Sequence, residues 1–199
     1  MNTLPNMLTM GRIVVILPIV ATFFVEDPTA RWVALWLYTL ACVTDFFDGW
    51  LARRSNLISD FGRFLDPIAD KLLIATLILM LAAFDRFSLW SAVPAAVIIC
   101  REILVSGLRE FLAGAKVKMP VTLLAKWKTT SQMFSLGFLI VGDATGERVL
   151  TTLFGWDVLL PVQVIGEILL GLAALLTLIT GYDYLRVGLA HILEGDRAR

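Results

Sequence analysis

Long apolar runs constrain the fold of this chain more than any other feature of its sequence. Stretches such as "LLIATLILMLAAF" (residues 72–84) and "FSLGFLIVG" (residues 134–142) recur along the chain. A transmembrane helix needs about 20 mostly apolar residues. Of the 199 residues, 58% are hydrophobic and only 17% are charged, whereas about a quarter are charged in an ordinary soluble domain. The sequence therefore predicts an integral membrane protein.

Six apolar segments are long enough to be helices, and polar or proline-containing stretches such as "EDPT", "SNLISD", "DRFS" and "KVKMP" separate them. The expected helices are Leu8–Val25, Arg31–Arg53, Gly62–Phe84, Leu89–Gly114, Val121–Val141 and Pro161–Leu189. We expect an all-α fold of six transmembrane helices that forms one domain over residues 1–199. The longer connection at residues 142–157 matches no pattern with a known role.

Basic residues are distributed unequally between the two ends of these helices. The even-numbered connections and the C-terminal tail contain Arg53, Arg54, Arg63, Lys116, Lys118, Arg197 and Arg199, whereas the odd-numbered connections mix a few arginines with many acidic residues. Short loops that are rich in Lys and Arg stay in the cytoplasm. Both termini are therefore predicted to be cytoplasmic, in a multi-pass membrane protein.

Aspartates gather at the predicted cytoplasmic ends of the second and third helices. Asp45 and Asp48 are three residues apart on one helix, and Asp66 and Asp70 are four apart on the next. Residues three or four apart share one face of a helix. A charged residue at the bilayer centre costs on the order of 2.5–3.5 kcal/mol, and close carboxylates also repel one another. A cation must therefore offset their charge.

The nature of that cation separates two interpretations. Nearby arginines and Lys71 could form a salt-bridged helix end. Alternatively, a cluster of oxygen ligands without His or Cys suits Mg²⁺ or Mn²⁺ rather than zinc, and four carboxylates can hold two ions for phosphoryl chemistry. We favour the metal interpretation, because solvated charges do not need small residues such as Gly49, Ala52 and Gly62 on the same faces.

The residues from Asp45 to Asp70 form the pattern D-x2-D-G-x2-A-R-x8-G-x3-D-x3-D. This pattern resembles the signature of the CDP-alcohol phosphatidyltransferases. The resemblance implies a six-helix fold with its active site at the cytoplasmic membrane interface and a two-metal centre. It also implies transfer of a phosphatidyl group from CDP-diacylglycerol to an alcohol, with release of CMP.

The resemblance also implies a role for each residue of the motif. Asp45, Asp48, Asp66 and Asp70 are expected to bind the two metal ions, and Asp70 is expected to act as the general base. The small and basic positions are expected to line the pocket for the CDP-lipid. These positions are Gly49, Ala52, Arg53 and Gly62.

The motif does not identify the acceptor, so we looked to basic residues on other helices. Arg101 and Arg109 lie near one face of the fourth helix, and Lys126 and Lys128 begin the fifth. Arginine and lysine together suit a phosphorylated acceptor, although any one of them could instead meet lipid headgroups. These segments and "LPNMLTMGRI" near the start resemble the branch of the family that uses glycerol 3-phosphate. In that branch Thr9 and Arg12 are also expected to reach the acceptor site.

Other functions and partners were weighed against this prediction. The same fold could use inositol phosphate, serine or phosphatidylglycerol as the acceptor. Carboxylates within membrane helices also occur in cation transporters. A path for cations would need polar residues on both sides of the membrane, but the outward halves of these helices are apolar. The net charge of zero gives no reason to expect binding to nucleic acid. The resemblance implies a homodimer, since members of the family are often dimers. Apolar faces on the helices would permit such an assembly.

Overall fold

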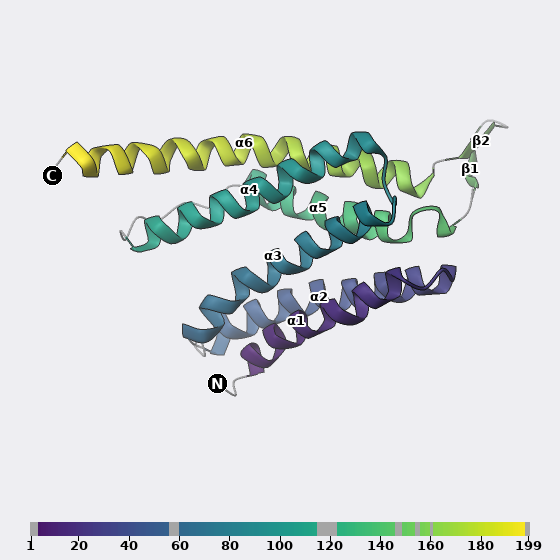
Figure 1. The fold of residues 1–199 in the computed structure, drawn as a ribbon, viewed down its shortest axis with the longest axis horizontal. Coiled ribbons are helices and arrows are strands. Elements are labelled where there is room, and N and C mark those ends of the chain that lie inside the picture. Colours follow the sequence, from purple (N-terminus) through teal and green to yellow (C-terminus); the bar gives the residue numbers. More distant parts are fainter. Residues whose placement is uncertain are drawn as a thin grey trace. The chain divides into compact units, whose positions relative to one another are not determined.

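The computed structural model describes the backbone of residues 4–55, 60–114, 123–145, 149–153, 156–159 and 161–197. It describes the side chains of residues 6–47, 62, 64–114, 123–142, 144 and 161–189. Six α-helices run through these residues (Figure 1). Their bounds are α1 Leu4–Phe23, α2 Pro28–Ser55, α3 Asp60–Ala83, α4 Leu89–Gly114, α5 Leu123–Val141 and α6 Val162–Arg197.

The six helices agree with the six that the sequence predicts, and the bounds of α4 coincide with the prediction. The other helices differ from it at their ends. The start that was predicted for the fifth helix, residues 121–122, lies outside the described residues. The helix α6 continues to Arg197, because "YDYLRVGLAHILEGDR" contains no proline and neither of its two glycines ends the helix.

The connection at residues 142–157 contains structure that the sequence did not predict. After a short 3₁₀ turn at Gly142–Thr145, strand β1 (Val149–Leu153) pairs antiparallel with strand β2 (Trp156–Leu159). The pairing brings Leu153 opposite Trp156, and its register is irregular between Val149 and Thr151. This hairpin is an exception to the predicted all-α fold. Its short strands were missed because they carry no alternation of apolar and polar residues.

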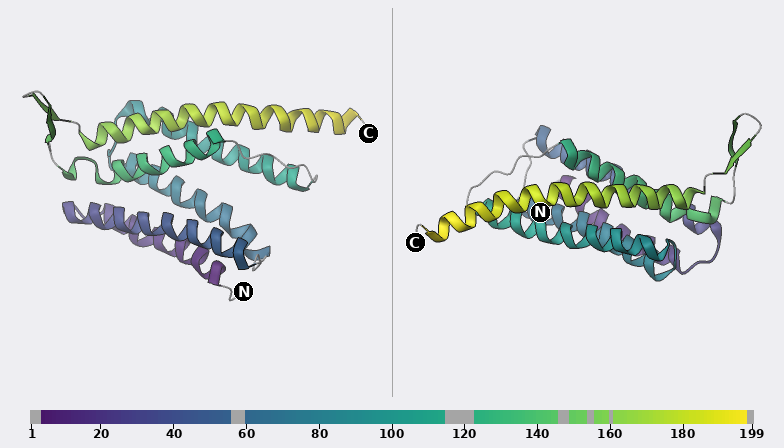
Figure 2. Two further views of the ribbon diagram at one scale, coloured as in Figure 1. Left: turned by 180° about the vertical axis from the view of Figure 1, so that it is seen from behind. Right: turned by 90° about the horizontal axis from the view of Figure 1, so that it is seen from above.

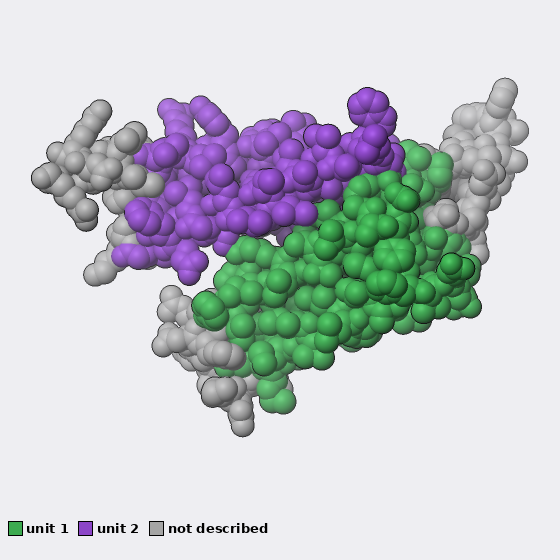
Figure 3. All heavy atoms as spheres, in the orientation of Figure 1, with its two compact units in different colours: residues 1–87, 136–166 green, residues 88–135, 167–199 purple. Residues whose placement is uncertain are grey.

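The chain forms two compact units (Figure 3). Unit 1 comprises residues 1–87 and 136–166, and unit 2 comprises residues 88–135 and 167–199. The helices α5 and α6 therefore contribute to both units. Each unit is described here by itself.

In unit 1, helix α1 packs along both α2 and α3 (Figures 1 and 2). The buried side chains include Ile19 of α1 and Leu77 and Leu81 of α3. At the far end from the aspartates, the ring of Phe84 lies 5.8 Å from that of Phe23. These apolar contacts hold three helices together, and they fix the ends of α2 and α3 that carry the motif.

Local signals explain where the helices of unit 1 begin and end. Asp27 precedes Pro28, and its Oδ1 accepts hydrogen bonds of 2.8 Å from both the amide and the hydroxyl of Thr29. This is a helix N-cap followed by proline at the first helical position. The two bonds lower the pKa of Asp27, because they stabilise its charged form. At the end of α5, Gly142 adopts a positive φ of 50°, which a glycine tolerates.

In unit 2, helix α4 packs against α6 at small residues. A Cβ atom added to Gly188 would come within 2.7 Å of Leu108 Cδ1, so glycine allows the close approach. At the start of α4, the carboxylate of Glu167 accepts hydrogen bonds from the amide (2.9 Å) and the hydroxyl (2.7 Å) of Ser88. A carboxylate at this position satisfies the amide at the helix start.

Within the part of the chain that the structure describes, three helices are long and apolar enough to cross a membrane: Asn6–Phe23 in α1, Leu89–Gly114 in α4 and Val162–Leu189 in α6. Large apolar side chains are exposed on these helices. Examples are Leu17, which is 72% exposed, and Trp90, which is 88% exposed. Lipid chains can cover such surfaces. The structure thus supports a membrane protein, whereas spanning by α2, α3 and α5 stays a prediction.

Candidate functional site

Helix α1 carries a buried polar face in a chain that is otherwise apolar. Asn6, Thr9 and Arg12 are three residues apart, so they lie near one face of the helix, and their exposed fractions are 3%, 1% and 2%. Buried polar groups require partners. For Thr9 and Arg12 these partners are two of the motif's aspartates.

Thr9 contacts the aspartate of α3. Its hydroxyl donates a hydrogen bond of 2.6 Å to Asp66 Oδ1. A hydroxyl bond to a carboxylate is charge-assisted and short. The rest of Asp66 is exposed, so Thr9 orients one oxygen of this carboxylate and leaves the other facing outward.

Arg12 contacts the aspartate of α2. Its Nη1 forms an ion pair with Asp45 Oδ1, and the arginine side chain is 1% exposed whereas that of Asp45 is 45% exposed. The pair offsets one of the carboxylate charges. The alternative interpretation of a salt-bridged helix end named Arg53, Arg54, Arg63 and Lys71. Arg12 was predicted to reach the acceptor site, but its pairing with Asp45 was not predicted.

Asp70 lies one turn after Asp66 on α3 and is exposed. It lies near Tyr38 and Cys42 of α2, and Asp45 and Arg12 also lie near Cys42. The structure therefore brings Asp45, Asp66 and Asp70 to the same end of unit 1, around the face that α1 presents.

Other residues of the motif are described only in part. Gly62 is buried at the start of α3. The backbone of Asp48, Gly49, Ala52 and Arg53 belongs to α2, but their side chains lie outside the described residues. Among the side chains that the structure describes, no three of His, Cys, Asp or Glu gather closely enough to hold a metal ion. The predicted four-aspartate centre is therefore seen only in part.

The described aspartates nevertheless fit a hard divalent cation in their chemistry. Each ionised carboxylate has two oxygens with about four lone-pair positions, and the contacts from Thr9 and Arg12 each use Oδ1 alone. Carboxylates that bind metals are commonly held by further hydrogen bonds of this kind. Carboxylates such as those of Asp45, Asp66 and Asp70 are ligands that suit Mg²⁺ or Mn²⁺.

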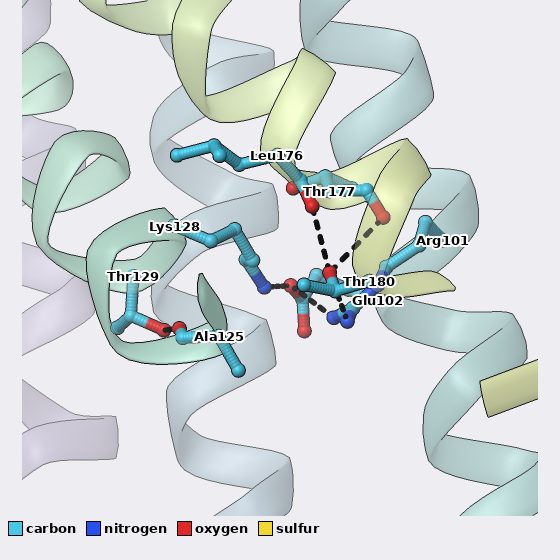
Figure 4. A network of polar contacts seen from close by, with 8 residues as sticks. All are labelled: Arg101, Glu102, Ala125, Lys128, Thr129, Leu176, Thr177 and Thr180. Atoms are coloured by element: carbon cyan, nitrogen blue, oxygen red, sulfur yellow. Dashed lines mark hydrogen bonds and ion pairs between the residues drawn. The ribbon is translucent and has the colours of Figure 1, made fainter. Parts of the chain in front are cut away.

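A second charged cluster lies in unit 2, where α4, α5 and α6 meet (Figure 4). Glu102 Oε1 forms ion pairs with both Arg101 Nη1, at 3.3 Å, and Lys128 Nζ. Lys128 is 5% exposed. One carboxylate oxygen therefore serves two cations from different helices.

The predicted acceptor residues divide according to these contacts. Arg109 and Arg101 contact the same aromatic ring, since both guanidinium groups lie over the ring of Tyr184. Lys126 is exposed on α5 and takes no part in the cluster around Glu102. Thr9 and Arg12 contact aspartates of the motif, and binding of the acceptor by these two residues stays a prediction.

Sequence reasoning missed Thr180 and Tyr184 of α6. Both are buried, at 2% and 6% exposure, and both contact Arg101. A signal was present in the sequence: Thr177, Thr180 and Tyr184 recur at steps of three and four in an apolar helix. This spacing indicates a polar face that needs a partner.

Comparisons with known proteins agree with the site. The sequence model of the CDP-alcohol phosphatidyltransferase family matches residues 2–179. A protein of Rickettsia bellii is 46% identical over 185 residues, which is 93% of this chain and 94% of that protein. Similar proteins of Cereibacter sphaeroides (37% identical, 96% of this chain and 98% of that protein) and Shigella flexneri serotype 5b (36% identical, 96% and 97%) share its name. That name is CDP-diacylglycerol–glycerol-3-phosphate 3-phosphatidyltransferase.

A family model that matches most of the chain, together with relatives that cover nearly all of it, defines the class. The chain belongs to the CDP-alcohol phosphatidyltransferase family, as the aspartate motif predicted. The match extends across both units. These relatives are named as transferases, which favours an enzyme over a cation transporter.

The shared carboxylate of Glu102 generates a prediction about stability. Glu102→Gln removes the negative charge that offsets Arg101 and Lys128 and leaves two largely buried cations beside a neutral amide. Such losses cost on the order of 1–3 kcal/mol, so we expect Tm in detergent to fall by roughly 5 °C. Glu110→Gln is the matched control, because Glu110 is exposed on the same helix. Equal Tm values for the two variants would contradict a stabilising role for Glu102.

Proposed function

We propose that this chain transfers the phosphatidyl group of CDP-diacylglycerol to glycerol 3-phosphate. A free hydroxyl oxygen of the acceptor attacks the lipid-bearing phosphorus, and the bond from that phosphorus to the oxygen of the CMP moiety breaks. CMP leaves with the bonding electron pair, and the hydroxyl proton passes to a carboxylate. The products are phosphatidylglycerophosphate and CMP.

One observation carries this proposal: three motif aspartates lie at one end of α2 and α3, and side chains of α1 hold two of them. The supporting similarity covers 93% of the chain in a relative named for this reaction. The motif alone supports the transfer of a phosphatidyl group. The choice of glycerol 3-phosphate depends on the relatives and on the basic cluster of unit 2.

Asp45, Asp48, Asp66 and Asp70 are proposed as the ligands of two divalent ions, Mg²⁺ or Mn²⁺. When bound, such ions neutralise the diphosphate and stabilise the charge that develops on the leaving phosphate. Thr9 and Arg12 are proposed to hold Asp66 and Asp45 in the orientation that binding requires. Their contact with the acceptor stays a prediction.

Asp70 is proposed as the general base. It is the last aspartate of the motif and is exposed on α3, so an acceptor hydroxyl can reach this carboxylate. Gly49, Ala52, Arg53 and Gly62 are proposed to line the pocket for the CDP-lipid, since small residues let a nucleotide approach the helix backbone.

The phosphate of the acceptor is proposed to bind Arg101, Arg109 and Lys128. Arg101 and Lys128 already share one carboxylate oxygen of Glu102, which shows that their charges reach a common point. A phosphate offers the same kind of oxygen and more charge. Serine and phosphatidylglycerol fit this cluster less well than glycerol 3-phosphate or inositol phosphate. Lys126 is exposed and is proposed only as a residue that attracts the acceptor.

The membrane arrangement is also part of the proposal. All six helices would cross the bacterial inner membrane, with both termini and the aspartates on the cytoplasmic side, where the soluble substrates are found. Open apolar faces such as those around Trp36 and Leu17 leave room for a homodimer. The basic residues of the even connections support this orientation.

An acceptor panel with purified protein tests the reaction. CDP-diacylglycerol is mixed with glycerol 3-phosphate, inositol phosphate, serine or phosphatidylglycerol, and the release of CMP is measured. We expect release with glycerol 3-phosphate, its loss on chelation of divalent ions and its recovery with Mg²⁺ or Mn²⁺. Release that depends on a different acceptor would overturn the proposed substrate, and release that survives chelation would overturn the metal centre.

The assignment of the base predicts the effect of Asp70→Asn. The amide keeps the shape of the side chain but cannot take the acceptor's proton, so kcat should fall by about 10²- to 10⁴-fold. Binding of CDP-diacylglycerol should be largely retained. Asp85→Asn is the matched control, since Asp85 is exposed and asparagine tolerates its positive φ of 50°. Asp70→Asn with a kcat equal to that of the control would remove Asp70 from the chemistry.

A further inference from the structure

Three residues of α6 lie directly against the side chain of Arg101. They are Thr180, Gly181 and Tyr184, which together we call the α6 clamp. All three lie after residue 179, where the match to the family model ends. The clamp and both arginines belong to unit 2. Each member of the clamp restrains Arg101 in a different way.

Thr180 supplies an acceptor for one guanidinium nitrogen. Arg101 Nη2 donates a hydrogen bond of 3.1 Å to Thr180 Oγ1, as Figure 4 shows. The hydroxyl itself donates to the carbonyl of Leu176, at 2.8 Å. Because that proton is directed into the helix, a lone pair of Oγ1 faces the arginine. Thr180 is 2% exposed, so water does not compete for this contact.

Gly181 supplies the space that the side chain of Arg101 fills. A Cβ atom added at this position would lie 3.1 Å from Arg101 Cγ and 3.5 Å from its Nε. The aliphatic part of the arginine thus rests on the bare helix backbone. A Cβ atom at position 181 would be closer to Arg101 Cγ than ordinary contacts allow, so the arginine side chain would have to shift by a few tenths of an ångström.

Tyr184 supplies an aromatic surface for two arginines. Its ring centroid lies 5.8 Å from Cζ of Arg101 and 5.3 Å from Cζ of Arg109. Both distances are within the range of a cation–π interaction, which is stronger when the ring is desolvated. Tyr184 is 6% exposed. One ring therefore holds two positive charges near each other, although they repel.

We infer that the α6 clamp positions Arg101 and Arg109 for the phosphate of the acceptor, and that Tyr184 is its principal member. This inference rests on the proposed function. Both guanidinium groups carry a positive charge, and the phosphate of the acceptor is an anion that can bind both of them. The clamp thereby sets the affinity for the acceptor and leaves the chemical step unchanged.

Tyr184→Leu tests the aromatic contact, because leucine is apolar but has no ring. We expect the KM for glycerol 3-phosphate to rise about tenfold, with kcat and the KM for CDP-diacylglycerol within about twofold of the wild type. Tyr184→Phe keeps the ring and should keep the KM. Tyr182→Leu is the matched control, since Tyr182 is on the same helix and is 67% exposed.

Gly181→Ala tests the same clamp without altering any ring or charge. The added methyl group displaces Arg101, so the KM for glycerol 3-phosphate should rise while kcat is kept. Gly171→Ala is its control, because a Cβ at Gly171 has nothing within 4 Å. This pair of variants preserves the test if Tyr184→Leu does not fold.

The outcomes separate the clamp from the proposed function. If wild-type protein releases CMP with glycerol 3-phosphate, but Tyr184→Leu and Gly181→Ala have the KM values of their controls, the clamp is only a packing contact and the inference is wrong. A fall in kcat with an unchanged acceptor KM also overturns it. If the wild type shows no dependence on glycerol 3-phosphate, the proposed function itself is wrong.

Discussion

The need to compensate charge inside an apolar chain governs this structure. The buried face of α1 supplies part of that compensation, since Arg12 pairs with Asp45 and Thr9 donates to Asp66. These contacts join three helices at the end where the motif lies. Each contact uses one carboxylate oxygen and leaves another for a ligand. The same side chains can therefore stabilise the helices and orient the aspartates.

The two units carry polar clusters of opposite charge. In unit 1, a buried arginine pairs with one aspartate of the motif, and Asp66 and Asp70 of the motif are exposed. In unit 2, basic side chains share Glu102 and the ring of Tyr184, which suits the binding of an anion. The proposed reaction needs both kinds of charge, because we propose that metal ions bind the diphosphate and that basic residues bind the phosphate of the acceptor.

Much of the fold could be predicted from the sequence. Six apolar runs with clear breakers gave six helices, and the bounds of α4 were correct because serine and glycine flank them. The hairpin Val149–Leu159 was missed, since its strands lack a pattern of period two. The aspartates were found because steps of three and four place charges on one face. Their partners on α1 could not be found, because spacing within a helix does not reveal which helices pack together.

The contacts of unit 2 show the same limit. Arg101 was predicted to bind the phosphate of the acceptor, but its partners Thr180 and Tyr184 lie about 80 residues further along the chain. Lys126 and Lys128 look equivalent in sequence, but only Lys128 turns inward to Glu102. The difference follows from helix geometry, since residues two apart point about 200° from each other.

The central claim is that the aspartates at the ends of α2 and α3 bind divalent metal ions. Titration of purified protein with Mn²⁺, followed by electron paramagnetic resonance, measures this binding directly. The account predicts about two bound ions per chain and a clear loss of binding in Asp66→Asn. Equal binding of Mn²⁺ by the wild type and by Asp66→Asn, or no binding by either, would contradict it.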